Sequence, residues 1–397
     1  MRRFSAHYIF TGTGTVLVKG IITLTDQGVV ADIIDTHGDP EEKAGVEFYS
    51  GVITPGFVNS HCHLELSHLR AAFPEKTGLP VFLKNVALSR NLEQNNVIDE
   101  ARRADTELWQ NGIVAVGDVS NTNTTFQLKS KSKITYHTFI ETLGFLPNRA
   151  EKVFRLAEGY LEEAGDLKLS ASIVPHSPYA VSQELFGKIS ALAERNHSIL
   201  SMHSQESSDE DDLYLSGNGE IYRHLSENLN LDLSSFEPTG ISALGSVIGM
   251  FPKDCNLLLV HNTRTGQKDL DLIKQTRQLD HTWFVICPDS NLFIEDRLPD
   301  IELFRKNKLQ ICLGTDGLSS NRKLSLLEEM KTVQTHFPGI PFGEMVTWAT
   351  RNGAEALDIN GWAGTIEIGK RPGINLITGM DLQQLRLQSH SKIKRLM

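Results

Sequence analysis

A chain of 397 residues is long enough to bury a large core, and its formal net charge of -10 leaves no basic excess for binding phosphate. Its 40% hydrophobic and 22% charged residues are ordinary for a globular protein and exclude the disordered and fibrous classes. We therefore expect a small molecule as the partner, and we do not expect nucleic acid.

Eight short apolar, β-branched runs follow in chain order, with stretches of helical spacing between them. They predict strands at about 52–64, 112–119, 133–141, 167–176, 197–205, 256–262, 281–287 and 308–316. The candidate helices are 79–111, 148–165, 182–195, 239–251, 265–279 and 324–336. Repeated strand–helix alternation is typical of a closed parallel barrel. We predict an α/β fold with a (β/α)8 barrel of the TIM type over residues 53–365, and the alternative is an open doubly wound sheet.

Both ends of the chain depart from this alternation. Residues 1–52 and 366–397 have the pattern of short strands joined by turns. Such segments on either side of a barrel predict one small β-sandwich built from both termini. The long connection 207–245 is expected to cover the mouth of the barrel, and the acidic residues of 207–212 are expected to form a solvated face.

The cysteines and the apolar runs bear on the compartment. None of the cysteines shows CxxC spacing, and each lies in or beside an apolar run, which favours buried thiols in a reducing compartment: Cys62, Cys255, Cys287 and Cys312. We find neither an apolar segment of signal-peptide length at the N-terminus nor a run of ~18 apolar residues. We therefore expect a cytoplasmic protein that does not enter a membrane.

Titratable residues stand where the predicted strands end. In the stretch PGFVNSHCHLEL, strand alternation would place three of them on one face: His61, His63 and Glu65. Later strands end in His176, in His203 with Glu206, in His261 and in Asp316. The carboxyl ends of barrel strands face the active-site mouth. Because buried imidazoles and carboxylates without partners are costly, a metal ion is the simplest reason for gathering them there.

The spacing of these residues predicts a single metal site. His61 and His63 can face one ion, and two more distant ligands, His203 and Asp316, complete a set that suits zinc or ferrous iron. A bound divalent cation lowers the pKa of its water from about 15.7 toward ~7. Glu206 lies near the ion without ligand spacing, so we expect it to shuttle protons.

Motifs spread over nearly the whole chain resemble those of one family: PGFVNSHCHLE, PHSPYAVS, MHSQES, VHNT, CPDSNLFI and LGTDGLSSN. The chain resembles the amidohydrolase superfamily, in particular its aminohydrolase branch of cytosine-, guanine- and adenosine-type deaminases and chlorotriazine-type hydrolases. The resemblance implies a barrel with a sandwich from both termini. It also implies hydrolytic deamination of a purine nucleoside-like or other aromatic heterocycle. The alternative is hydrolysis of another C–N, amide-like or C–halogen bond.

The resemblance also implies a role for each residue at the rim. It makes four residues the ligands of a single divalent metal: His61, His63, His203 and Asp316. Glu206 would move protons to the ring nitrogen and the leaving group, His261 would orient the attacking water, and Asp316 would accept a proton from it. The fourth strand offers His176 and no lysine to bridge two metals, which favours one ion, zinc before iron.

The substrate contacts rest on weaker patterns. Glu65, in the form HxHLE, resembles aminodeoxyfutalosine deaminases, in which the corresponding glutamate would contact a nucleoside; the alternative is a brace behind a metal histidine. His176 is expected to contact substrate. Asn291 and Ser319 are expected either to line the pocket or to brace a loop. A homodimer is expected by analogy only.

Overall fold

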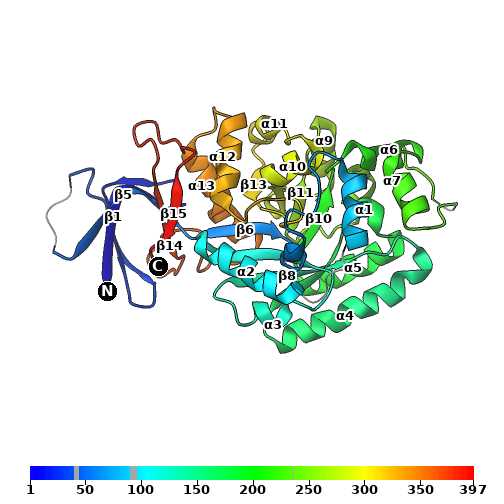
Figure 1. Ribbon diagram of the computed structural model, residues 1–397, viewed down its shortest axis with the longest axis horizontal. Helices are drawn as coiled ribbons and strands as arrows, with labels where there is room; N and C mark the ends of the chain where they lie inside the picture. The colour runs from blue at the N-terminus through cyan, green and yellow to red at the C-terminus, as the bar shows by residue number, and fades with distance from the viewer. Residues whose placement is uncertain (40–43, 90–95, 235) are drawn as a thin grey trace.

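The computed structural model describes residues 1–39, 44–89, 96–234 and 236–397. Figure 1 shows a small group of strands from both termini beside a larger body in which strands are surrounded by helices. The larger body carries the predicted polar residues, and its strands determine where those residues lie.

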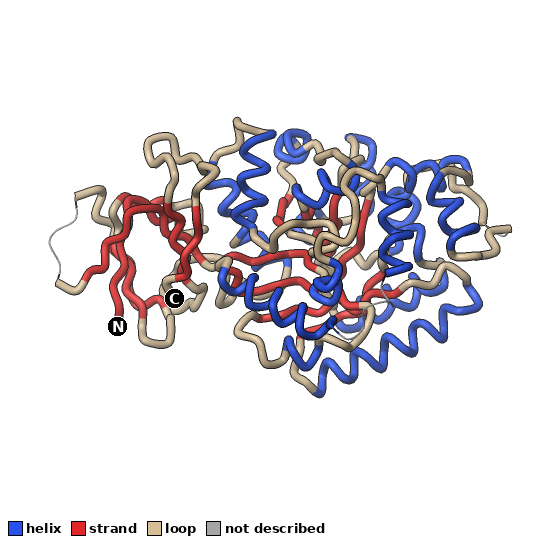
Figure 2. Tube along the Cα trace, viewed as in Figure 1, coloured by secondary structure: helices blue, strands red, loops and turns tan. Residues whose placement is uncertain are grey.

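The predicted strands are present in the larger body as two parallel sheets (Figure 2). One contains β6 (Phe57–Cys62), β7 (Ile113–Ser120), β8 (Thr135–Thr142) and β9 (Ser170–Pro175). The other contains β10 (Leu200–Ser204), β11 (Leu257–His261), β12 (Thr282–Ile286) and β13 (Gln310–Leu313). Nearly all of these strand residues are buried, which explains why the runs are apolar throughout rather than alternating.

Hydrogen bonds cross from one sheet to the other at both edges. Between β9 and β10, the backbone N–H of His203 donates to the carbonyl oxygen of His176 at 2.9 Å. Between β6 and β13, the N–H groups of Thr315 and Asp316 both donate to the carbonyl oxygen of His61, at 3.0 and 3.1 Å. Asn59 adds a side-chain clasp to Thr315, donating to its hydroxyl at 2.8 Å and accepting its N–H at 3.1 Å.

Helices lie between and after the strands. They are α1 (Leu79–Ser89), α2 (Val97–Gln110), α3 (Phe126–Lys129), α4 (Ala150–Asp166), α5 (Gln183–Asn196), α6 (Ser208–Ser216), α7 (Glu220–Arg223), α8 (Ala243–Val247), α9 (Gln267–Thr276), α10 (Pro288–Glu295), α11 (Ile301–Lys306), α12 (Leu326–His336), α13 (Phe342–Ala349) and α14 (Arg351–Ala356). The single helix predicted over 79–111 corresponds to α1 and α2, with residues 90–95 outside the described part. None of the described helices has the length and apolar character needed to cross a membrane.

The two termini meet in one sheet of seven strands. Its members are β1 (Arg2–Phe10), β2 (Val16–Val18), β3 (Ile21–Leu24), β4 (Val30–Ile34), β5 (Val46–Pro55), β14 (Ile374–Thr378) and β15 (Lys392–Arg395). Strand β14 from the C-terminal segment pairs with β5 from the N-terminal one. The sheet has a hydrophobic core of its own, which includes Phe4, Ile22 and Leu376. The structure therefore confirms that the termini join, while a two-layered sandwich stays a prediction.

The first predicted strand, 52–64, is wrong as a continuous element. Its beginning belongs to β5 in the terminal sheet, and β6 starts only at Phe57. Gly56 connects the two strands. A residue with a Cβ would not fit here, because the Cβ would lie only 2.6 Å from the carbonyl oxygen of Pro372. The strand also ends at Cys62, and a 3-10 helix, η1 (Leu64–Leu69), follows directly.

A buried ion pair holds the chain just after His63. Lys129 and Asp118 form this pair with both side chains fully buried. The Lys129 ammonium also donates to Ser120 at 2.8 Å, and the Asp118 carboxylate accepts the backbone N–H of Leu64 at 2.8 Å. Removing one member would leave the other charge buried and unpaired.

The Lys129→Met variant should therefore lower the free energy of unfolding by about 3–5 kcal/mol. Urea unfolding measures the change, and Lys131→Met, at an exposed position, is the control. The double variant Lys129→Met with Asp118→Leu should recover part of the loss, because it removes both charges. Equal stability of the two lysine variants would contradict this role.

Candidate active site

The four predicted metal ligands converge at the carboxyl ends of the strands, and all are buried. Asp316 Oδ1 lies 3.5 Å from His61 Nε2 and 3.4 Å from His63 Nε2. His63 Nε2 lies 3.2 Å from His203 Nε2. Two atoms bound at ~2.0–2.1 Å to one tetrahedral ion are roughly 3.3 Å apart, so these separations match those of ligands sharing an ion. Among the described residues, neither ring nitrogen of His61 has a hydrogen-bond partner.

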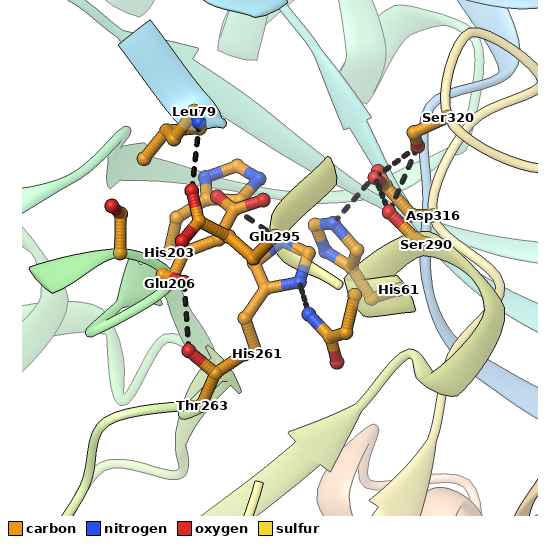
Figure 3. Close-up of polar contacts among 12 residues, drawn as sticks. His61, Leu79, His203, Glu206, His261, Thr263, Ser290, Glu295, Asp316 and Ser320 are labelled. Atoms are coloured by element: carbon orange, nitrogen blue, oxygen red, sulfur yellow. Dashed lines mark hydrogen bonds and ion pairs between the residues drawn. The ribbon is translucent and has the colours of Figure 1, made fainter. Parts of the chain in front are cut away.

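Asp316 is held so that one oxygen faces the histidines (Figure 3). Its other oxygen, Oδ2, accepts hydrogen bonds from Ser290 at 2.7 Å and Ser320 at 2.6 Å. Burial alone would raise the pKa of this carboxyl, but the facing imidazoles hold it well below its usual range. The backbone of Asp316 has a φ of +56°, a strained value of the kind found at functional sites.

The hydrogen bond of His203 determines which of its nitrogens can bind a metal. Its Nδ1 lies 2.9 Å from the carbonyl oxygen of His176, which can only accept, so Nδ1 carries the proton. The lone pair is then on Nε2, which faces His63. Burial lowers the pKa of His63 to about 4 and that of His203 well below its usual value. Both rings are therefore neutral at pH 7, the form that binds metals.

Glu206 and His261 lie side by side next to this cluster (Figure 3). Glu206 Oε2 is 3.6 Å from His261 Nε2, and Glu206 Oε1 is buried without a hydrogen-bond partner among the described residues. Burial, reinforced by the negative charge of Asp316, raises the pKa of Glu206 well above its usual value. This shift favours the protonated form of Glu206, which is the form that a general acid requires.

Asn291 orients His261 instead of lining the cavity. Its amide Nδ2 donates to His261 Nδ1 at 2.9 Å. Burial lowers the pKa of His261 to about 3, so the ring is neutral and its proton is on Nε2, toward Glu206. Asn291, expected either to line the pocket or to brace a loop, is hydrogen-bonded to His261 and is not part of the cavity lining.

Glu210 corrects the expectation of a solvated acidic face. Its side chain is fully buried, and its carboxylate accepts the backbone N–H groups of Gln205, Glu206 and Ser207, the shortest at 2.7 Å from Glu206. Burial raises the pKa of Glu210 to about 8. Ser207 and Glu210 form the capping box of α6. Their S-x-x-E spacing is a capping-box signal that is present in the sequence.

A cavity of about 430 Å³ opens beside the cluster of predicted metal ligands. His176 and Ser319 line it, as expected of substrate contacts, together with Glu206, His261 and three of the four predicted ligands, His63, His203 and Asp316. Its walls are mostly apolar: Leu79, Phe82, Leu83 and Val86 from α1, and Leu225, Leu229 and Leu231 from the segment after β10. The segment 207–245 therefore contributes to the cavity wall, while its expected role as a cover over the mouth stays a prediction.

Glu65 lies outside the cavity lining, contrary to the expected strand alternation. It belongs to η1, a 3-10 helix in which the alternation of a strand no longer holds. Its carboxylate accepts the N–H groups of Asn121 at 3.1 Å and Thr122 at 3.3 Å, and the Thr122 hydroxyl at 3.2 Å. In this structure Glu65 braces the turn after β7.

Ser290 and Glu141 are among the polar residues of the site that were not singled out in the sequence. Ser290 lies beside Asn291 in the CPDSN motif, and Glu141 lies near the end of β8 and lines the cavity. Burial alone would raise the pKa of Glu141, but His176 and the other facing imidazoles hold it below its usual range. A predicted strand ending in Thr-Phe-Ile-Glu offered a signal for Glu141, because it puts a carboxylate after an apolar run.

Parallel strands whose carboxyl ends carry clustered imidazoles, a carboxylate and a buried glutamate with a raised pKa beside a cavity are typical of hydrolases that activate water at a metal. The chain belongs to the amidohydrolase family, whose model matches residues 52–394. An adenosine deaminase of Helicobacter pylori is 31% identical over 89% of this chain and 87% of its own. An aminodeoxyfutalosine deaminase of a Nitratiruptor species is 27% identical over 91% of each chain.

Solved structures agree with this assignment. A Helicobacter pylori aminofutalosine deaminase in complex with methylthio-coformycin has a TM-score of 0.82 and 26% identity, covering 100% of both chains. An adenosine deaminase of Xanthomonas campestris with bound zinc has a TM-score of 0.71 at 18% identity, covering 98% of this chain and 87% of that one, and supports the fold alone. The predicted family and the predicted class of enzyme, a hydrolytic deaminase, are confirmed.

Proposed function

We propose that this enzyme removes the exocyclic amino group of an adenosine-like nucleoside as ammonia. The observation that carries the proposal is Glu206, a buried carboxyl with a raised pKa that stands beside the histidine cluster at one end of a largely apolar cavity. The relatives named as adenosine and aminodeoxyfutalosine deaminases support an adenine-type substrate. The apolar side chains of α1 in the cavity wall favour a nucleoside that carries an apolar substituent.

We propose one divalent cation, zinc before iron, as the cofactor. His61, His63, His203 and Asp316 would hold it, since their facing atoms have the separations of shared ligands and two of the rings are neutral. Zinc is bound in the Xanthomonas campestris structure, which shares the fold. When bound, such a cation lowers the pKa of a water toward ~7 and so supplies the nucleophile.

The residues of the chain would perform the proton transfers. Glu206, protonated in its buried position, would donate to the ring nitrogen next to the carbon that carries the amino group. The Nε2–H of His261 faces the same region and would orient the attacking water. Asp316 would accept one proton from that water. The second proton of the water would pass through Glu206 to the amino group, which would leave as ammonia, and the proton on Asp316 would then restore Glu206.

Three further expectations belong to the same proposal. We infer that the two parallel sheets form a (β/α)8 barrel over residues 53–365, because hydrogen bonds join them at both edges, and that segments 1–52 and 366–397 fold as a sandwich. Buried free thiols at all four cysteines favour the cytoplasm. A homodimer, with neither nucleic acid nor membrane as partner, completes the proposal.

Purified enzyme should release ammonia from adenosine or from an adenosine bearing an apolar 5′ substituent, and should not release it from cytosine. An ammonia assay over a panel of adenine nucleosides, cytosine and chlorotriazines measures this directly, with the protein's metal content determined in parallel. Chloride release from a triazine without ammonia release from any nucleoside would favour the alternative hydrolase and contradict the proposal.

A further inference from the structure

Glu141 connects two other residues that line the cavity. Its side chain is 3% exposed, and its Oε1 lies 2.7 Å from Nδ1 of His176. Its Oε2 accepts a hydrogen bond from the Asn121 amide at 2.7 Å. Asn121 follows β7, Glu141 is in β8, and His176 follows β9, so one carboxylate joins the ends of three neighbouring strands.

These contacts are those of a hydrogen-bonded pair and do not form a second metal site. Glu141, His176 and His203 offer ligand atoms close enough to hold an ion. However, 2.7 Å is shorter than the roughly 3.3 Å between two ligands of a tetrahedral ion and is normal for a hydrogen bond to a carboxylate. His203 Nδ1 is already bonded to the His176 carbonyl oxygen at 2.9 Å and lies 3.4 Å from Glu141.

The contact also determines what His176 can offer a ligand. A carboxylate oxygen only accepts, so the proton between Glu141 and His176 is on Nδ1 of the ring. Nε2 is then the ring nitrogen left for a ligand, and no described residue hydrogen-bonds to it. A polar group on the substrate, such as a sugar hydroxyl, can hydrogen-bond to this nitrogen.

We propose that Glu141 is a positioning residue for substrate binding, holding His176 with its Nε2 open to a ligand and holding Asn121 in a fixed orientation. The inference rests on the proposed function, because it needs a substrate in this cavity. Glu141 would act through these two side chains and would leave the metal ligands unaffected.

The Glu141→Gln variant should separate binding from chemistry. It should raise KM about 10- to 100-fold, the effect expected from losing a charge-assisted hydrogen bond. Both neighbours donate to Glu141, and a glutamine has only one accepting oxygen, so its NH2 group would face the other donor. The kcat should stay within roughly threefold of wild type, and the metal content should be unchanged. Glu163→Gln is the matched control, since Glu163 also accepts from an asparagine, Asn123, at 2.6 Å but lies on α4 outside the cavity lining.

A double-mutant cycle tests the pathway through His176. If Glu141 acts through His176, adding Glu141→Gln to His176→Ala should change KM by less than the single variant does. Unchanged KM in Glu141→Gln, a fall in metal content, or fully additive effects would each overturn the proposal. If Glu141→Gln fails to fold, His176→Ala and Asn121→Ala should still each raise KM, and the proposal is wrong if neither does. A wild-type enzyme that releases no ammonia would instead overturn the proposed function, and this inference with it.

Discussion

Replacing Glu206 by glutamine should abolish most of the turnover and leave the metal in place. Glutamine has nearly the same shape but cannot donate the acid proton, and general acid–base catalysis typically contributes about 10²–10⁴-fold to the rate. Because Glu206 is not one of the four converging ligands, the metal content of the Glu206→Gln variant should equal that of wild type. Ammonia release and elemental analysis of the same preparation measure the two quantities.

The control for this experiment is Glu163→Gln, whose rate should be that of wild type. A Glu206→Gln enzyme that turns over at close to the wild-type rate would show that another group protonates the ring. A variant that loses both rate and metal would move Glu206 from proton transfer to metal binding. The raised pKa of Glu206 and its unpartnered Oε1 favour proton transfer over metal binding.

Protein stripped of metal by a chelator should be inactive and should regain activity with one equivalent of Zn²⁺ per chain. The stripped protein should also melt at a lower temperature, because an ion that binds only the folded state stabilises it. His61→Asn should prevent recovery, since it removes one of the ligands that face Asp316. Activity and thermal melting during titration with zinc measure both effects.

His281→Asn is the matched control for the ligand variant. His281 is hydrogen-bonded to Asn256 at 3.0 Å and lies outside the cavity lining, so this variant should take up zinc as wild type does. Full activity in protein shown to hold no divalent metal would contradict the metal site.

Most strand positions and the convergence of the polar residues at the strand ends could be predicted because both follow from local patterns, while the binding of a metal by these residues stays a proposal. Strands of a buried parallel sheet appear as continuous apolar runs, and a polar residue just after such a run lies at the carboxyl edge. His203, His261 and Asp316 all follow this rule, and the structure brings them together.

The predictions that failed concern residues whose position depends on a partner far away in the sequence or on the residue at which a strand ends. The orientation of Glu65 follows from the ending of β6 at Cys62, which no periodicity marks. Ser290 gains its role only because Asp316 lies beside it. The charge of Glu210 suggested solvent exposure, but three backbone N–H groups compensate for its burial.

The clasp between Asn59 and Thr315 has a consequence for how the protein is made. These residues are 256 positions apart in the chain, and His61 and Asp316 lie beside them. During synthesis from the N-terminus, the first two histidines leave the ribosome long before Asp316 exists. A growing chain therefore carries only part of the ligand set until its eighth parallel strand is complete. The complete set of proposed ligands can therefore assemble only after Asp316 has been made.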